Sequence, residues 1–170
     1  DKFIIFGFTS IIWKNFLKSF INKKKHINMS NGILLHGGGW KKLSSKGISN
    51  NKFKKYIYKY TKINEVINYY GMVEQTGSVF FECKFGYFHT SEYSEVLIRD
   101  KNFKICKNKK TGLIQLLSVV PTSYPGNSIL TEDIGSVYGL DNCSCGKKGK
   151  YFKVYGRIES AELRGCSDVI

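Results

Sequence analysis

The chain has 170 residues, which is enough for one domain with a sizeable hydrophobic core. It carries 27 basic and 13 acidic side chains, and the net charge of +14 would by itself suggest a nucleic-acid partner. Only Arg99, Arg157 and Arg164 are arginines, although arginine forks are the usual means of reading bases and clamping phosphates. We therefore expect no nucleic-acid partner.

The apolar content excludes a membrane-spanning segment, because no run of about 18 apolar residues occurs. Ile4–Phe20 is hydrophobic but contains Lys14 and Lys18 and lacks a cleavage pattern, so it is not a signal peptide. Five cysteines without a secretion signal predict reduced thiols in a cytoplasmic protein. The chain opens at Asp1 without an initiator methionine, so we expect it to be a fragment of a longer protein.

The first segments predict a strand followed by a helix. Lys2–Phe8 is apolar and strand-like, and Thr9 or Ser10 then supplies an N-cap for an amphipathic helix that runs to about residue 22. The residues expected to face the core from this helix include Ile11, Phe16 and Phe20.

A second strand and helix follow at Gly32–His36 and Asn50–Tyr60, and Ile63–Ile67 is a third short apolar run. This β-α-β-α-β order predicts parallel strands with right-handed crossovers. Ligands in such sheets bind at the carboxyl ends of the strands, where both Gly37–Gly39 and Tyr70–Glu74 fall. Two candidate site loops are thus expected on one edge of one sheet.

From Ser78 onward the helical periodicity disappears. Short strands between Gly, Asn and Pro turns predict a mainly antiparallel β subdomain. The fold class expected is α/β, with a parallel βαβ half (residues 1–77), a β-rich subdomain (78–155) and a hinge or start of a C-terminal segment (156–170). The predicted strands are Gly86–His89, Ser94–Arg99, Thr111–Ser118, Asp133–Tyr138 and Lys150–Val154.

The residue types around Tyr70 are those of a nucleotide site. Tyr70 offers a flat face to a base, Gly71 permits close backbone approach, and Glu74 is able to hold a divalent metal. The plain alternative is a strand-to-loop turn with a buried tyrosine. Gly37, Gly38 and Gly39 are a weak signal alone, because they lack the spacing of dinucleotide and P-loop motifs.

Three further features carry candidate chemistry. Asp133 stands at a predicted strand start, where it is either a turn residue or an acceptor for the vicinal hydroxyls of a ribose. Arg157 follows a predicted strand, where an arginine is suited to bind phosphate or to act in a hinge. Cys143-Ser-Cys145-Gly146 favours a tight turn with reduced thiols; a zinc site with Cys83, Cys106 or His89 is the alternative, although the spacing is not C-x₂-C.

Taken in order, these motifs resemble the signatures of the adenylate-forming ligases. The segments His36–Trp40, Tyr70–Gln75, Thr131–Gly135 and Gly156-Arg157 carry the resemblance, which covers nearly the whole chain. Within that superfamily the chain is most similar to the LuxE-type acyl-protein synthetases, relatives of phenylacetate-CoA ligase. The ending Glu162–Asp168 adds to this closer match.

The resemblance implies a role for each residue. Gly37, Gly38 and Gly39 would line the adenine and Tyr70 would stack on it. Glu74 would hold Mg²⁺ near the phosphates of ATP, Asp133 would bind the ribose, and Arg157 would orient the C-terminal part. Cys166 would accept the acyl group, although an ordinary terminal thiol is an equal alternative.

The implied activity is activation of a long-chain fatty acid as an acyl-adenylate, followed by transfer to a protein cysteine. The implied partners are the fatty acid and an acyl reductase or another acyl-acceptor protein. The phosphate loop and acyl pocket of the family are absent from this stretch, so the fragment alone is expected not to turn over. The alternatives are an acyl- or aryl-CoA ligase and a basic non-enzymatic binding module.

Overall fold

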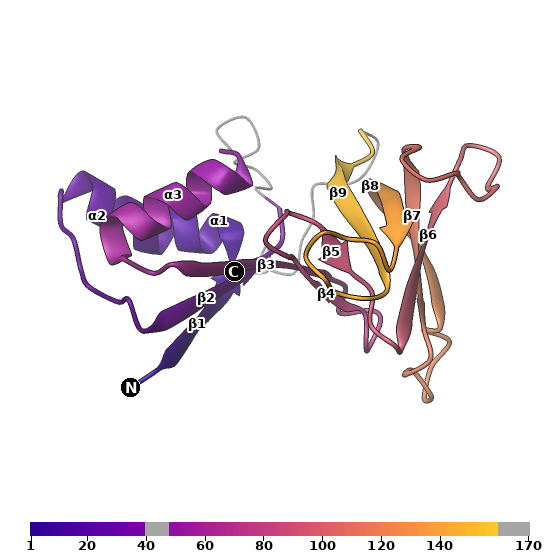
Figure 1. The fold of residues 1–170 in the computed structure, drawn as a ribbon, viewed down its shortest axis with the longest axis horizontal. Helices are drawn as coiled ribbons and strands as arrows, with labels where there is room; N and C mark the ends of the chain where they lie inside the picture. Colours follow the sequence, from indigo (N-terminus) through magenta and orange to yellow (C-terminus); the bar gives the residue numbers. More distant parts are fainter. Residues whose placement is uncertain (40–47, 160–170) are drawn as a thin grey trace. The chain divides into compact units, whose positions relative to one another are not determined.

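A computed structural model describes residues 1–39 and 48–159 of the chain. They form two compact units, one holding Asp1–Asn68 and the other beginning at Tyr69 (Figure 1). The expected α/β class is confirmed, since one part carries parallel strands and helices and the other an antiparallel sheet. The predicted domain division after residues 77 and 155 stays a prediction. Within the described ranges, no helix has the length and apolar character needed to cross a bilayer.

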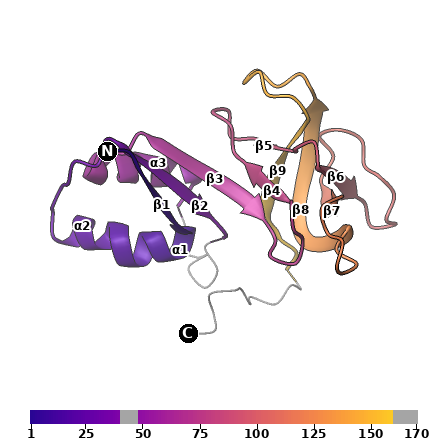
Figure 2. The same ribbon diagram turned by 90° about the horizontal axis from the view of Figure 1, so that it is seen from below.

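The first unit is a small sheet with helices on one face (Figures 1 and 2). Strands β1 (Phe3–Phe8) and β2 (Gly32–Gly37) are parallel, as predicted. Next to β2 lies β3 (Glu65–Gly71), and helix α3 (Asn50–Thr61) connects these two strands in sequence. Right-handed strand-helix-strand crossovers of this kind place the helices over the sheet face that they bury.

The first helix is interrupted by a wide turn that the sequence pattern does not predict. It consists of α1 (Thr9–Ile11), a π-helical segment η1 (Ile12–Leu17) and α2 (Lys18–Asn22). The extra residue per turn shifts the phase of the side chains. Of the residues predicted to face the core, Ile11 is 41% exposed, while the neighbouring Ile12 is buried, so the prediction for Ile11 is wrong.

The predicted N-cap at Thr9 or Ser10 is wrong. The residue in the cap position is Phe8, and it makes no side-chain cap hydrogen bond. The Thr9 hydroxyl instead donates to the carbonyl oxygen of Gly37 at 3.0 Å, because the parallel pairing brings the ends of β1 and β2 together. A residue that caps helices elsewhere thus fastens two strand ends here.

Helix α3 agrees with its prediction and extends by one residue to Thr61. The Ser49 hydroxyl caps it by accepting from the Lys52 amide at 3.3 Å. The core of the unit lies between this helix, η1 and the sheet. Its buried members are Ile12, Leu17, Leu34, Phe53, Ile57, Tyr60, Ile63 and Val66, and Phe16 and Phe20 pack against them.

The strand β3 runs to Gly71, beyond the predicted end at Ile67, so Tyr70 and Gly71 belong to a strand and not to a loop. In the second unit, Tyr69–Gly71 pair with β4 in an antiparallel manner. The backbones are close at Gly71, where a Cβ would meet the carbonyl oxygen of Ser78 at 2.8 Å. The close approach foreseen for this glycine is therefore made by the chain itself.

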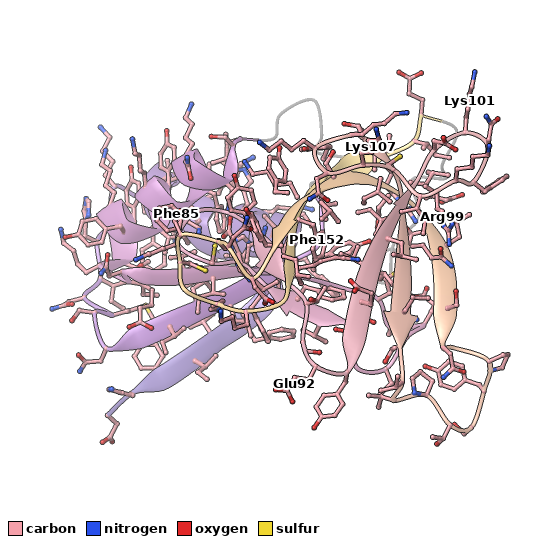
Figure 3. All side chains as sticks on the ribbon, turned by 45° about the vertical axis from the view of Figure 1, so that its right-hand side comes forward. Phe85, Glu92, Arg99, Lys101, Lys107 and Phe152 are labelled. Atoms are coloured by element: carbon pink, nitrogen blue, oxygen red, sulfur yellow. The ribbon has the colours of Figure 1, made fainter. Side chains whose placement is uncertain are left out.

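The second unit contains a five-stranded antiparallel sheet with the order β5-β9-β8-β7-β6. Its strands confirm the predicted β-rich half. Strand β8 is longer than the predicted Asp133–Tyr138, because it begins at Ser128, and Asp133 therefore lies inside the strand. The core includes the fully buried Phe152, labelled in Figure 3. The strands are β4 (Val79–Phe81), β5 (Phe88–His89), β6 (Ser94–Arg99), β7 (Gly112–Ser118), β8 (Ser128–Leu140) and β9 (Lys150–Arg157).

A buried histidine supports the start of the glycine loop. His36 is only 2% exposed, and its Nδ1 lies 2.9 Å from the Thr9 hydroxyl oxygen. Because that hydroxyl donates to Gly37, Nδ1 carries the proton and donates to Thr9. Burial, helped by the positive charge of Lys54, lowers the pKa of His36 to about 4, so the ring is neutral near pH 7.

We predict an acid-sensitive contribution of His36 to stability. The folded pKa of about 4 lies below the ordinary 6.5, so the unfolded chain takes up the proton first as pH falls. Stability is lost between these values, by about 3 kcal/mol at pH 4. Urea unfolding of the full-length protein from pH 7 to 4 should show this loss in the wild type and not in His36→Gln. The exposed His26→Gln is the control and should keep the wild-type pH dependence; an unchanged pH dependence in His36→Gln would contradict the assignment.

Candidate nucleotide site

Tyr70, at the end of β3, is held by an aromatic cluster. Its ring centroid lies 6.0 to 6.2 Å from those of Phe80, Phe88 and Phe152. The hydroxyl donates to Asp133 Oδ2 at 2.7 Å, across 63 residues of sequence. Burial first, and then the negative charge of Asp133, raise the pKa of Tyr70 far above its ordinary value. Tyr70 therefore stays protonated and acts as a fixed hydrogen-bond donor.

Asp133 and Arg157 face each other across the β8–β9 pair. Their Cα positions are direct partners, and Arg157 Nε lies 3.6 Å from Asp133 Oδ1. Arg157 also reaches Glu132, with 3.4 Å between Nη2 and Oε2. The Asp133 side chain is only 16% exposed, whereas that of Arg157 is 41% exposed. Asp133, expected at a strand start or turn, is thus an enclosed strand residue with a partner on each carboxylate oxygen.

The turn after β3 is anchored by Gln75, for which the sequence predicts no role. Gln75 is 1% exposed, and its amide Nε2 donates to the carbonyls of Leu116 and Gly126 at 3.2 and 2.7 Å. Ser78 Oγ donates to its Oε1. Such a fully paired buried amide fixes the backbone on either side of it. The signal in the sequence is a neutral amide directly after a carboxylate, but the carbonyl partners of Gln75 are 41 and 51 residues away.

Glu74 precedes this anchor and is exposed. The turn therefore holds one side chain inside and offers the next to solvent. An exposed carboxylate on a fixed backbone is an oxygen donor of the kind that Mg²⁺ accepts.

The glycine loop belongs to the first unit. Gly37 is the last residue of β2, and Gly38 follows with φ of +73°, a conformation that favours glycine. Gly39 closes the described part of this loop and is exposed, as Gly38 is. Cys166 lies outside the described residues. In the structure, the side chains of Tyr70, Asp133 and Arg157 are in contact. The glycines lie at the end of β2, in the first unit.

A family model described as "Acyl-protein synthetase, LuxE" matches residues 1–170. No curated protein matches the chain at a significant level. Among solved structures, an open conformation of a 2-hydroxyisobutyryl-CoA ligase, in complex with 2-HIB-AMP and CoA, is similar with a TM-score of 0.67 at 16% identity. That similarity covers 92% of this chain and 34% of the other.

Two further solved structures share the fold. A long-chain-fatty-acid–CoA ligase from Archaeoglobus fulgidus gives a TM-score of 0.60 at 10% identity, over 91% of this chain and 34% of that chain. The McyG A-PCP structure with phenylalanyl-adenylate gives 0.59 at 14% identity, over 92% and 30%. At these identities the likeness shows the fold alone. The chain spans about a third of the length of these structures.

We predict that the hydroxyl of Tyr70 stabilises the folded protein through its hydrogen bond to Asp133. Tyr70→Phe keeps the ring packing and removes the donor to a carboxylate, which should lower the free energy of unfolding by about 1 to 3 kcal/mol in urea titrations. Tyr138→Phe is the matched control, because its hydroxyl pairs with that of Tyr155 at 2.9 Å in an exposed position. The control should change stability by less than about 0.5 kcal/mol. Equal effects of the two substitutions would contradict the assignment.

Proposed function

We propose that this chain, which belongs to the LuxE acyl-protein synthetase family, carries the nucleotide-binding part of an enzyme that activates a carboxylic acid with ATP. The observation that carries the proposal is the contact of Tyr70, Asp133 and Arg157. These three side chains come from three strands and from motifs spread over most of the second unit. A carboxylate held in this way is a preformed acceptor for the two hydroxyls of a ribose.

In the first half-reaction, a carboxylate oxygen of the acid attacks the α-phosphorus of ATP, and the bond to the β-phosphate bridging oxygen breaks. The products are the acyl-adenylate and pyrophosphate. Asp133 would orient the nucleoside through its ribose, and Tyr70 would stack on the base. Positioning of this kind, together with charge neutralisation, accounts for most of the catalysis in phosphoryl-transfer chemistry.

Glu74 would hold the magnesium ion, because its exposed carboxylate offers the hard oxygen ligand that this metal takes. A bound Mg²⁺ supplies positive charge against the phosphate oxygens. Gln75 contributes by keeping the turn in place, and this contribution depends on its two carbonyl partners and not on the metal.

In the second half-reaction, the thiolate of Cys166 attacks the acyl carbonyl, its proton passes to solvent, and the bond to AMP breaks. The product is a thioester on the protein, from which a reductase or another acceptor takes the acyl group. Arg164, two residues before Cys166 in the sequence, would favour the thiolate form of that cysteine. The acid is a long-chain fatty acid, and the reaction takes place in the cytoplasm.

A second candidate keeps the first half-reaction and uses CoA as the thiol. The observation in its favour is the similarity in fold to structures described as CoA ligases. In that case Cys166 has no acyl-carrying role and the acyl group leaves the protein as a soluble thioester.

The first step is tested by acid-dependent exchange of labelled pyrophosphate into ATP with the full-length protein. We expect exchange with fatty acids and at least a tenfold loss in Glu74→Gln, because one metal ligand loses its charge. Glu92→Gln, which changes another exposed glutamate (Figure 3), should exchange as the wild type does. No exchange with any acid would contradict the ligase proposal and favour a basic binding module. Equal exchange in Glu74→Gln would remove Glu74 from the site.

The acceptor is tested by incubating the full-length protein with ATP and labelled fatty acid. We expect label on the protein that hydroxylamine releases, and its loss in Cys166→Ser with pyrophosphate exchange retained. Cys106→Ser is the control and should label normally. Undiminished label in Cys166→Ser would contradict the role of this cysteine, and label that appears only in acyl-CoA after addition of CoA would support the second candidate.

A further inference from the structure

Four metal-ligating side chains meet in the second unit, and none of them takes part in the contact of Tyr70 with Asp133. Cys83, His89, Cys143 and Cys145 each point one ligand atom into a common space, and these atoms lie within 4.8 Å of one another. The three other than Cys145 are buried. Cys106, the remaining described cysteine, is not part of this group. The sequence had favoured a simple turn of reduced thiols at Cys143–Cys145.

The ligands come from two hairpin turns that strand pairing holds side by side. Cys83 lies between β4 and β5, His89 is the last residue of β5, and Cys143 and Cys145 lie in the turn between β8 and β9. The pairing of β5 with β9, with His89 opposite Tyr151, sets the two turns next to each other. Only the topology brings the pairs together, because more than 50 residues separate His89 from Cys143 in sequence.

Each turn has a tight backbone that presents its cysteine. In the first, the amide of Cys83 donates to Tyr87 O and the amide of Gly86 donates to Cys83 O, both at 2.8 Å. In the second, the amide of Gly146 donates to Cys143 O at 3.0 Å, and Gly146 has φ of +87°. The amide of Lys147 then donates to Cys145 Sγ at 3.4 Å, an interaction that favours a thiolate.

The distances suit a tetrahedral ion. Zinc bonds of the usual length place two ligand atoms about 3.5 to 3.8 Å apart, depending on whether sulfur or nitrogen is involved. Cys145 Sγ and His89 Nε2 are 3.4 Å apart. No two ligand atoms of the group are more than 4.8 Å apart, which is about 1 Å more than the separation of ligand atoms around a bound zinc ion.

The charge of the ligand set also suits a metal. Zinc takes cysteine as the thiolate and histidine as the neutral imidazole. Three thiolates and one neutral imidazole around a divalent ion leave one negative charge. Lys84, Lys147 and Lys148 lie within three residues of a ligand in the sequence, and their positive charges offset that negative charge.

We propose that Cys83, His89, Cys143 and Cys145 bind one zinc ion as a structural Cys₃His site. Binding displaces the protons of the three thiols to solvent, and no oxidation or reduction takes place. Four protein ligands fill a tetrahedral ion, so the site leaves no position for a substrate and is distinct in kind from the magnesium site. A set of sulfur and nitrogen ligands selects zinc over magnesium.

The site would act by joining the two turns. Phe88 and Phe152, which pack against Tyr70, are the chain neighbours of His89 and of its partner Tyr151. A metal that fixes the hairpins at this end therefore holds the aromatic cluster under Tyr70. Loss of the metal should lower the melting temperature of the protein, and restoration of zinc should recover it.

The test is metal analysis of the full-length protein, purified under reducing conditions and reconstituted with zinc alone. We expect about one zinc ion per chain, retained through desalting, and absorption typical of tetrahedral cobalt–thiolate coordination when cobalt replaces zinc. Cys83→Ser, His89→Gln and Cys145→Ser should each lose most of the zinc. Cys106→Ser should keep it, because that thiol lies outside the group.

Two results would overturn the proposal. One is a reconstituted, folded wild-type protein without stoichiometric zinc, in which all four thiols of Cys83, Cys106, Cys143 and Cys145 react freely with a thiol reagent. The other is retention of zinc by the Cys83→Ser and Cys145→Ser variants at the wild-type level. If circular dichroism shows that a variant is unfolded, the wild type is treated with a thiol reagent instead. Release of zinc by the reagent supports the proposed site, and no release contradicts it.

Discussion

The second unit depends on one buried electrostatic contact, in which Asp133 accepts from Tyr70 and faces Arg157. A carboxylate that is mostly removed from water requires partners, since an unpaired one would cost several kcal/mol. Here the partners are a neutral donor whose pKa is raised and a guanidinium that remains half exposed. The three residues must therefore be placed together when β3, β8 and β9 assemble, which ties the candidate nucleotide site to the folding of the sheet.

The turns next to these strands combine fixed side chains with accessible ones. Gln75 is fully paired inside the turn, while Glu74 next to it is exposed. At the other end of the cluster, the two hairpin turns carry four ligand side chains whose atoms meet. In the first case hydrogen bonds of the side-chain amide fix Gln75, and in the second the pairing of β5 with β9 brings the two turns together. This arrangement suits a site whose chemistry rests on positioning.

Much of this architecture could be predicted from the sequence, because the periodicity of hydrophobic residues and the residues typical of turns are local signals. The strand Ser94–Arg99 and the helix beginning at Asn50 appear where the pattern puts them. The π-helical turn at Ile12–Leu17 could not be predicted, since its hydrophobic spacing still resembles a regular helix. The roles of Gln75 and His89 depend on partners 40 or more residues away, and only pairing reveals those. The order of the motifs identified the candidate residues. Their contacts could not be predicted, because these depend on how distant strands pair in the fold.

The proposed role of Asp133, fixed by Tyr70 and Arg157, is to receive the ribose. The affinity of the full-length protein for ATP and for 2′,3′-dideoxy-ATP, in the wild type and in Asp133→Asn, tests this role most directly. We expect that loss of the two hydroxyls weakens binding to the wild type by about tenfold or more, as expected for charge-assisted hydrogen bonds. We also expect that Asp133→Asn discriminates much less between the two nucleotides. Equal discrimination by both proteins would contradict this role.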